Sequence, residues 1–199
     1  MIIGNLSVFA IESSITQAYE RLSFRALGFF VIYVGGRCYG RRSPDSTMLA
    51  CSYDEVKRRI AERRSHSTPF ATESDAGQIA DAFRDAIYAE KQQERHFGMP
   101  LPDFVRVIHS KRIMWAPDGD EAFDDGSYVL QFDVGDRVRL IAFKSTKENL
   151  HDPATLSDVW LPADDFYRVL QGWHDAFVAE WASMPKISGA DGARGNTTE

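Results

Sequence analysis

The stretch SYVLQFDVGDRVRLIAF (residues 127–143) predicts a β-hairpin at the centre of the fold. Apolar and polar residues alternate on both sides of a glycine-containing turn, as they do in paired strands. A two-residue turn would place Phe132 opposite Arg139 and mix apolar with charged side chains on one face. A three-residue loop over residues 134–136 places Phe132 opposite Val138 and keeps one face apolar. We therefore expect the second register.

A further hairpin is predicted upstream. Residues 24–34 are almost wholly apolar and rich in β-branched and aromatic side chains, which is typical of a strand covered on both faces. Gly35 and Gly36 follow, and both can adopt the positive φ that a two-residue turn requires. This turn pairs Tyr33 with Cys38 on the returning strand.

The remaining pattern contains both helices and strands. We expect strands over residues 7–12 and within 104–116, a loop over 98–102, and helices over 52–64, 75–93 and from Pro162 onward. Ser52 and Glu55 have capping-box spacing, which would begin the first helix at Ser52 and turn its basic residues Lys57, Arg58, Arg59, Arg63 and Arg64 largely outward. The last helix is the strongest prediction because its large apolar residues recur at helical spacing: Phe166, Leu170, Trp173, Phe177 and Trp181.

Together these elements predict an α+β fold. It consists mainly of antiparallel sheet built from β-hairpins, packed against about three helices, with a long C-terminal amphipathic helix. We expect a single α+β domain over residues 1–185. Residues 186–199 are rich in Gly, Ser, Thr and Asn, so we expect a disordered tail there.

Composition and charge narrow the classes of function. At 44% hydrophobic and 12% aromatic, the 199 residues can fill a core. The net charge is −6 and is uneven, with +4 over residues 1–64 and −10 over the rest, which argues against nucleic-acid binding and would steer a basic partner to the later part. Two cysteines without a disulfide pattern indicate a reducing compartment. The chain shows no signal peptide and no membrane span, so we expect it in the cytoplasm.

The sequence offers no signature of catalysis. Its five histidines are scattered without metal-ligand spacing, and no nucleophile elbow, phosphate loop or dinucleotide fingerprint is present. We therefore predict no catalytic residues, no bound metal and no cofactor.

One acidic cluster stands out between residues 118 and 125. Its five carboxylates lie within eight residues but lack the full ligand set and the glycine of a calcium loop. Three interpretations stay open, in decreasing order of preference: a solvated turn, a partner-binding patch, and a metal or catalytic site. The preceding tryptophan is more often a core residue than an interface anchor. The candidate partner-binding residues are Trp115, Asp118, Asp120, Glu121, Asp124 and Asp125.

Four segments carry a resemblance to a known family. They are the opening MIIGNLSVFAIE, the strand-turn GGRCYG, the stretch DDGSYVLQFDVGDRVRLIAF, and the ending DVWLPADDFYRVLQGWHDAFVAEW. In these the chain resembles immunity protein family 42, whose members are encoded beside secreted polymorphic toxins of bacteria. The resemblance implies an α+β protein that is not an enzyme and that binds and neutralises a cognate toxin domain in the producing cell. It supplies no catalytic residues and no binding site. The alternative is a small carboxylate- or metal-dependent hydrolase that uses the Asp118–Asp125 cluster.

Overall fold

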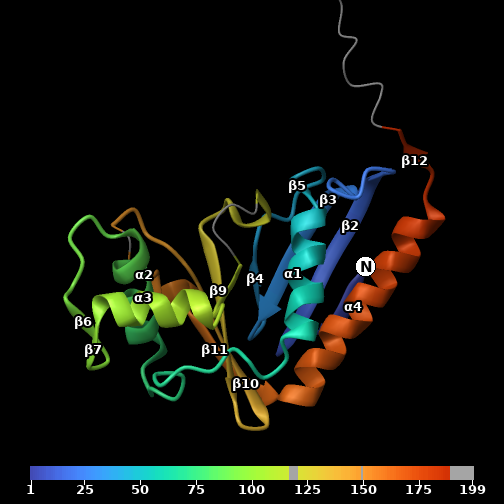
Figure 1. The fold of residues 1–199 in the computed structure, drawn as a ribbon. Helices are drawn as coiled ribbons and strands as arrows, with labels where there is room; N and C mark the ends of the chain where they lie inside the picture. Colours follow the sequence, from blue (N-terminus) through green and yellow to red (C-terminus); the bar gives the residue numbers. More distant parts are fainter. Residues whose placement is uncertain (117–120, 149, 189–199) are drawn as a thin grey trace, which may run out of the picture.

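The computed structural model describes residues 1–116, 121–148 and 150–188. It has an α+β fold, as predicted, with three sheets and four α-helices in this part of the chain. Figure 1 shows two helical layers, with α1 and α4 on one side of the molecule and α2 and α3 on the other.

The larger sheet has six strands. It runs in the order β1 (Ile2–Asn5), β2 (Phe9–Tyr19), β3 (Ala26–Val34) and β4 (Arg37–Tyr39); β5 (Thr47–Met48) also pairs with β3, and β12 (Lys186–Ile187) pairs with β2. All these pairings are antiparallel except that of β12. The predicted turn between β3 and β4 is confirmed, with Tyr33 opposite Cys38. Gly35 and Gly36 adopt φ values of +59° and +82°, which glycine reaches without strain.

The second sheet has four antiparallel strands. Its order is β11 (Ser157–Pro162), β10 (Arg137–Lys144), β9 (Ser127–Val134) and β8 (Met114–Ala116). A separate two-stranded hairpin joins β6 (Arg95–His96) to β7 (Met99–Pro100).

The predicted register of the central hairpin is wrong. Phe132 lies opposite Arg139, and the turn is the two-residue one. The prediction assumed one apolar face, but both faces of β9 and β10 are buried in separate clusters. Arg139 is accommodated because its guanidinium forms an ion pair with Asp158 (2.8 Å) and donates to the carbonyl of Ala71 (3.0 Å). A buried charge with such partners does not force a change of register.

Four helices cover the sheets. They are α1 (Ala50–Ala61), α2 (Ala76–Tyr88), α3 (Leu101–Ser110) and α4 (Ala163–Ser183), together with the short 3-10 helices η1 (Glu121–Phe123) and η2 (Pro153–Thr155). One hydrophobic cluster lies between the six-stranded sheet, α1, α4 and the inner face of β9 and β10. The other lies between α2, α3 and the opposite face of β9 and β10.

Helix α4 confirms the strongest prediction. It begins directly after Pro162, and Phe166, Leu170, Trp173 and Phe177 are all fully buried. The Trp173 indole also donates to the Ser13 hydroxyl of β2 (2.9 Å), so the helix is fixed on the sheet by a hydrogen bond as well as by packing.

The start and the faces of α1 differ from the prediction. The helix begins at Ala50 after Leu49, without a side-chain cap, so Ser52 lies inside the first turn and the capping box is wrong. Glu55 instead forms ion pairs with Arg58 and Arg59. Arg59 was predicted to point largely outward but is fully buried.

Three other boundaries differ. The segment over residues 104–116 contains helix α3 before strand β8, because Phe104 and Ile108 lie one helical turn apart and are both buried against α2 and the sheet. The predicted loop over residues 98–102 contains strand β7 and the start of α3, and the predicted helix over 75–93 ends at Tyr88. Lys186 and Ile187, predicted to belong to a disordered tail, pair with β2, and residues 189–199 lie outside the described residues.

Candidate functional site

Trp115, a candidate anchor beside the acidic cluster, lies in the core. Its side chain is 2% exposed and packs against Phe9 and Phe166, with ring centroids 5.8 Å apart in both pairs. The Arg59 guanidinium lies 5.3 Å from the centroid of its ring. In this conformation the indole stabilises the fold and presents no surface to a partner.

The acidic cluster is only partly described by the structure. Asp118 and Asp120 lie outside the described residues. Glu121 and Asp124 are exposed on and just after η1, and no side-chain hydrogen bond or ion pair is recorded for either of them with another described residue. Asp125 is half-buried, accepts from the Ser127 amide (3.2 Å) and pairs with Lys144 (2.6 Å). The exposed charge of the described cluster is therefore carried mainly by Glu121 and Asp124.

The turn that presents these two carboxylates is anchored to the larger sheet. Ala122 and Phe123 are buried between Glu121 and Asp124. The Phe123 ring packs edge-on against Phe30 of β3, with centroids 6.3 Å apart, and the Ala122 carbonyl accepts from the Arg41 amide (2.6 Å). Such a turn holds its charges without a large ordering cost when a partner binds.

A chain of contacts links η1 to helix α2. The Gly126 carbonyl accepts from the Ser145 amide (2.9 Å), and Ser145 forms a β-bridge with His151. The ring Nδ1 of His151 lies 2.7 Å from the Asp81 carboxylate, and its amide donates to the same oxygen (3.0 Å). We call the side chains along this line the acidic edge: Glu121, Asp124, Asp125, Asp81 and Asp85.

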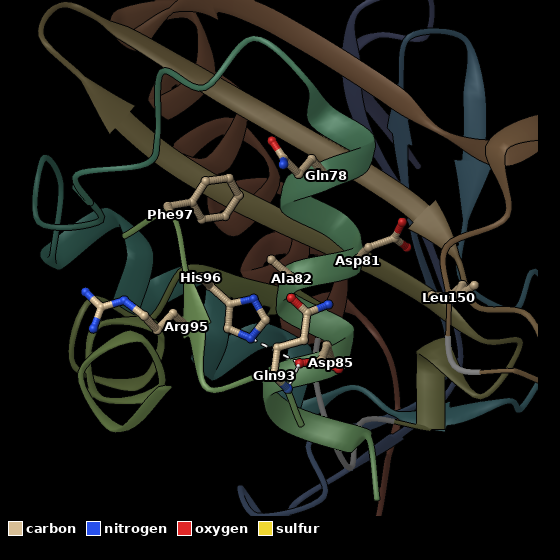
Figure 2. Close-up of a pocket in the computed structure, with 9 residues that line it drawn as sticks. All are labelled: Gln78, Asp81, Ala82, Asp85, Gln93, Arg95, His96, Phe97 and Leu150. Carbon is tan, nitrogen blue, oxygen red and sulfur yellow. Dashed lines mark hydrogen bonds and ion pairs between the residues drawn. The ribbon is translucent and has the colours of Figure 1, made fainter. Parts of the chain in front are cut away.

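A pocket of about 250 Å³ lies at the α2 end of the acidic edge (Figure 2). Among the residues that line it are Gln78, Asp81, Asp85, His96, Phe97 and Leu150. They come from α2, the β6–β7 hairpin and the segment after β10, three parts of the chain that meet only in the folded protein.

The sequence interpretation missed this pocket. Asp81 and Asp85 stand four residues apart in a segment already predicted to be helical, and this spacing places two side chains on one helix face. This spacing could therefore have indicated an acidic helix face. Nothing local to the sequence indicates that His96 and Leu150 lie against the same face.

Described groups with shifted pKa values include several that belong to buried structural contacts rather than to the acidic edge. Burial, together with the neighbouring Arg59 cation, lowers the pKa of His66. Burial and the Asp133 carboxylate raise the pKa of Tyr167, whose hydroxyl donates to that carboxylate (3.0 Å). Burial alone would raise the pKa of Glu12, but hydrogen bonds from Arg42 and Tyr33 outweigh it and hold the pKa below its usual value. These groups stabilise contacts between elements.

Within the described ranges, no group of three or more His, Cys, Asp or Glu side chains is placed to hold a metal ion. The acidic cluster has two members outside these ranges, so the predicted absence of a divalent metal stays a prediction. No helix in the described part of the chain has both the length and the apolar composition to cross a membrane.

The structure thus consists of an α+β core with an anchored, charged edge. The sequence of residues 1–176 matches the family Immunity protein 42, and the chain belongs to this family. It is therefore a toxin-neutralising immunity protein, and membership of this family suggests a non-enzymatic role. The predicted family resemblance is confirmed.

A solved structure shows a similar fold. CdiI from Burkholderia dolosa superposes with a TM-score of 0.54 at 16% sequence identity, over 88% of this chain and 99% of that chain. No curated protein sequence is significantly similar. At this identity the likeness concerns the fold alone, and no binding residue is transferred from it.

Proposed function

We propose that this protein neutralises its toxin by binding a cognate toxin domain directly and in a fixed ratio, with the acidic edge as part of the contact surface. The observation that carries the proposal is the pair of exposed carboxylates of Glu121 and Asp124 on a turn whose apolar residues are locked in the core. Family membership supplies the class of partner.

The negative charge of the acidic edge supports a partner with a basic surface. Exposed carboxylates attract cationic groups over roughly a Debye length, about 8 Å at physiological ionic strength. They would mainly raise the rate of association and orient the encounter, and this contribution would decrease with added salt. The proposal places the encounter in the cytoplasm of the producing cell, in keeping with Cys38 and Cys51, neither of which forms a disulfide.

The first experiment asks whether a partner toxin exists. The gene adjacent to the one for this chain is co-expressed with it, and survival and co-purification are measured. We expect the chain to rescue growth and to co-purify with the toxin domain. A neighbour that is harmless to cells, or a toxin that kills equally with and without this chain, would contradict the proposed function.

The second experiment tests the acidic edge. Glu121→Gln with Asp124→Asn keeps shape and removes two charges, and the Asp125–Lys144 ion pair is left intact. We expect the dissociation constant for the toxin to rise roughly two- to thirtyfold at low salt, since exposed ion pairs contribute about 0.2–1 kcal/mol each. The matched control is Glu20→Gln with Glu180→Gln, which removes one exposed and one half-buried charge elsewhere. Equal binding by both double variants, each folded by circular dichroism, would show that the turn is only solvated.

A further inference from the structure

In the α2 pocket, each of the two carboxylates accepts hydrogen bonds at only one of its two oxygens. One oxygen of Asp81 takes both contacts from His151, and the Oδ2 of Asp85 accepts from the Gln93 amide (2.8 Å). The second oxygen of each carboxylate makes no recorded hydrogen bond with any described residue. The side chains of Asp81 and Asp85 are 40% and 19% exposed, so they remain accessible from the pocket.

A second feature of the pocket, the buried side chain of His96, also indicates that it binds a ligand. Its side chain is 4% exposed and lines the pocket, and its Nε2 has no hydrogen-bond partner among the described residues. This nitrogen lies 3.1 Å from Asp85 Oδ2, a contact that is an ion pair only when the imidazole is protonated and that makes no hydrogen bond (Figure 2). Buried nitrogens without a partner are uncommon because the lost hydration is not replaced.

A group that only donates hydrogen bonds would satisfy both the unused carboxylate oxygens and the His96 nitrogen. A carboxylate oxygen accepts, and a neutral imidazole accepts at its unprotonated nitrogen. A cation placed between Asp85 and His96 can donate to both and also reach Asp81 one helical turn away. A guanidinium has five donors in a planar fork that suits two acceptors at once, whereas an ammonium is a compact, strongly hydrated point charge.

The pocket is also open to an incoming side chain. Arg95, the nearby cation, points away from Asp81 and Asp85 (Figure 2) and donates to the Gly98 carbonyl. Phe97 forms an apolar wall, and Leu150 is 48% exposed at the pocket's edge. Arginine side chains that contribute strongly to protein interfaces often bind in pockets of this kind, with charged groups inside and apolar side chains at the edge.

We propose that this pocket receives the guanidinium of one arginine side chain of the cognate toxin, held by Asp85, Asp81 and His96. The proposal rests on the proposed function for the identity of the partner and deepens it by naming a recognised group. The pocket lies at the end of the acidic edge, so charges on η1 would guide the basic surface and the pocket would fix its register.

The first test uses a small probe and needs no toxin. The full chain is titrated with N-acetyl-arginine methylamide and followed by the amide NMR signals of Asp85, Gln93 and His96. We expect saturable shifts at millimolar concentrations, and none with the citrulline analogue, which has the same shape without the charge. The shifts should disappear in Asp85→Asn, which can still accept from the Gln93 amide, and persist in Asp103→Asn, an exposed carboxylate on α3. Equal shifts with citrulline, or none with arginine, would overturn the proposal.

The second test uses the toxin domain. Asp81→Asn with Asp85→Asn should raise its dissociation constant by at least about tenfold, since removing one partner of a buried interfacial charge pair leaves the other charge unpaired and speeds dissociation. The Glu20→Gln, Glu180→Gln control should change it little. If the original chain binds the toxin and the pocket variant binds equally well, the pocket proposal fails while the proposed function stands. If the original chain binds no toxin, the proposed function fails, and the arginine titration still decides whether the pocket binds a guanidinium.

Discussion

Replacing Arg59 with methionine tests how helix α1 is joined to the four-stranded sheet. The Arg59 side chain is 1% exposed, and its guanidinium donates hydrogen bonds to four acceptors. It reaches Glu55 Oε1 (2.7 Å), Gln131 Oε1 (2.9 Å), and the carbonyl oxygens of Arg112 (3.0 Å) and Met114 (2.8 Å). Three of these acceptors belong to β8, β9 or the segment before β8, so this one side chain links two layers.

The expected loss of stability follows from these contacts. Methionine fills much of the same space and has a similar helix propensity, but it donates no hydrogen bond. Glu55 keeps Arg58 as a partner and is 16% exposed, so it can be solvated in part. The three neutral acceptors lose their donor, and an unsatisfied buried acceptor costs about 1–3 kcal/mol. Allowing for relaxation, we expect a loss of about 3–5 kcal/mol in the free energy of unfolding, a large share of the roughly 5–15 kcal/mol of a typical domain.

The assay is urea unfolding followed by tryptophan fluorescence and circular dichroism. The matched control is Arg58→Met, which changes the neighbouring residue, whose side chain is 45% exposed and contacts the same Glu55. It should change stability by less than about 1 kcal/mol. Arg59→Lys keeps the charge with fewer donors and should fall between the two, which preserves the test if Arg59→Met does not fold. Similar midpoints for Arg58→Met and Arg59→Met would refute the reasoning.

Three further predictions concern pH, packing and metal. Below the ordinary histidine pKa of 6.5, the unfolded chain takes up a proton at His66 that the folded chain resists, so the free energy of unfolding should decrease as pH falls from 6.5 toward the lower folded pKa. His66→Asn, which can keep the bond to the Lys111 carbonyl, should flatten this dependence in urea unfolding measured at several pH values. Gly28→Ala should cost roughly 1–3 kcal/mol or more, measured by thermal unfolding, because its Cβ would lie 1.9 Å from the Ser14 carbonyl oxygen. Calorimetric titration with calcium, magnesium and manganese should be flat, because the acidic cluster lacks a full ligand set.

Each of these has a result that would contradict it. An unchanged pH dependence in His66→Asn would assign the effect to other groups. Gly172→Ala on α4 is the packing control, since its nearest neighbour would be 3.3 Å away and helix propensity improves by up to about 1 kcal/mol; a Gly28→Ala protein as stable as this control would show that the strands can shift freely. Micromolar metal binding that Asp120→Ala abolishes would revive the metal interpretation of the cluster.

Elements with local signals could be predicted from the amino-acid sequence. The β3–β4 turn follows from two adjacent glycines, and α4 follows from an apolar stripe at helical spacing. Both depend on backbone preference or periodicity within one segment. Family membership was also visible in the sequence, because the quoted segments mark strands, turns and a helix that recur together.

Features that depend on what lies opposite a residue could not be predicted in this way, because they follow from contacts between distant segments. The register of β9 and β10 could not be chosen by keeping one face apolar, because a second cluster with α2 and α3 covers the other face. Arg59 is buried because acceptors from other elements surround it, and Trp115 is a core residue because two layers close over it. The α2 pocket likewise exists only where α2, the β6–β7 hairpin and the segment around Leu150 come together. Periodicity reports the environment that a segment prefers, whereas these positions are set by partners far away in the chain.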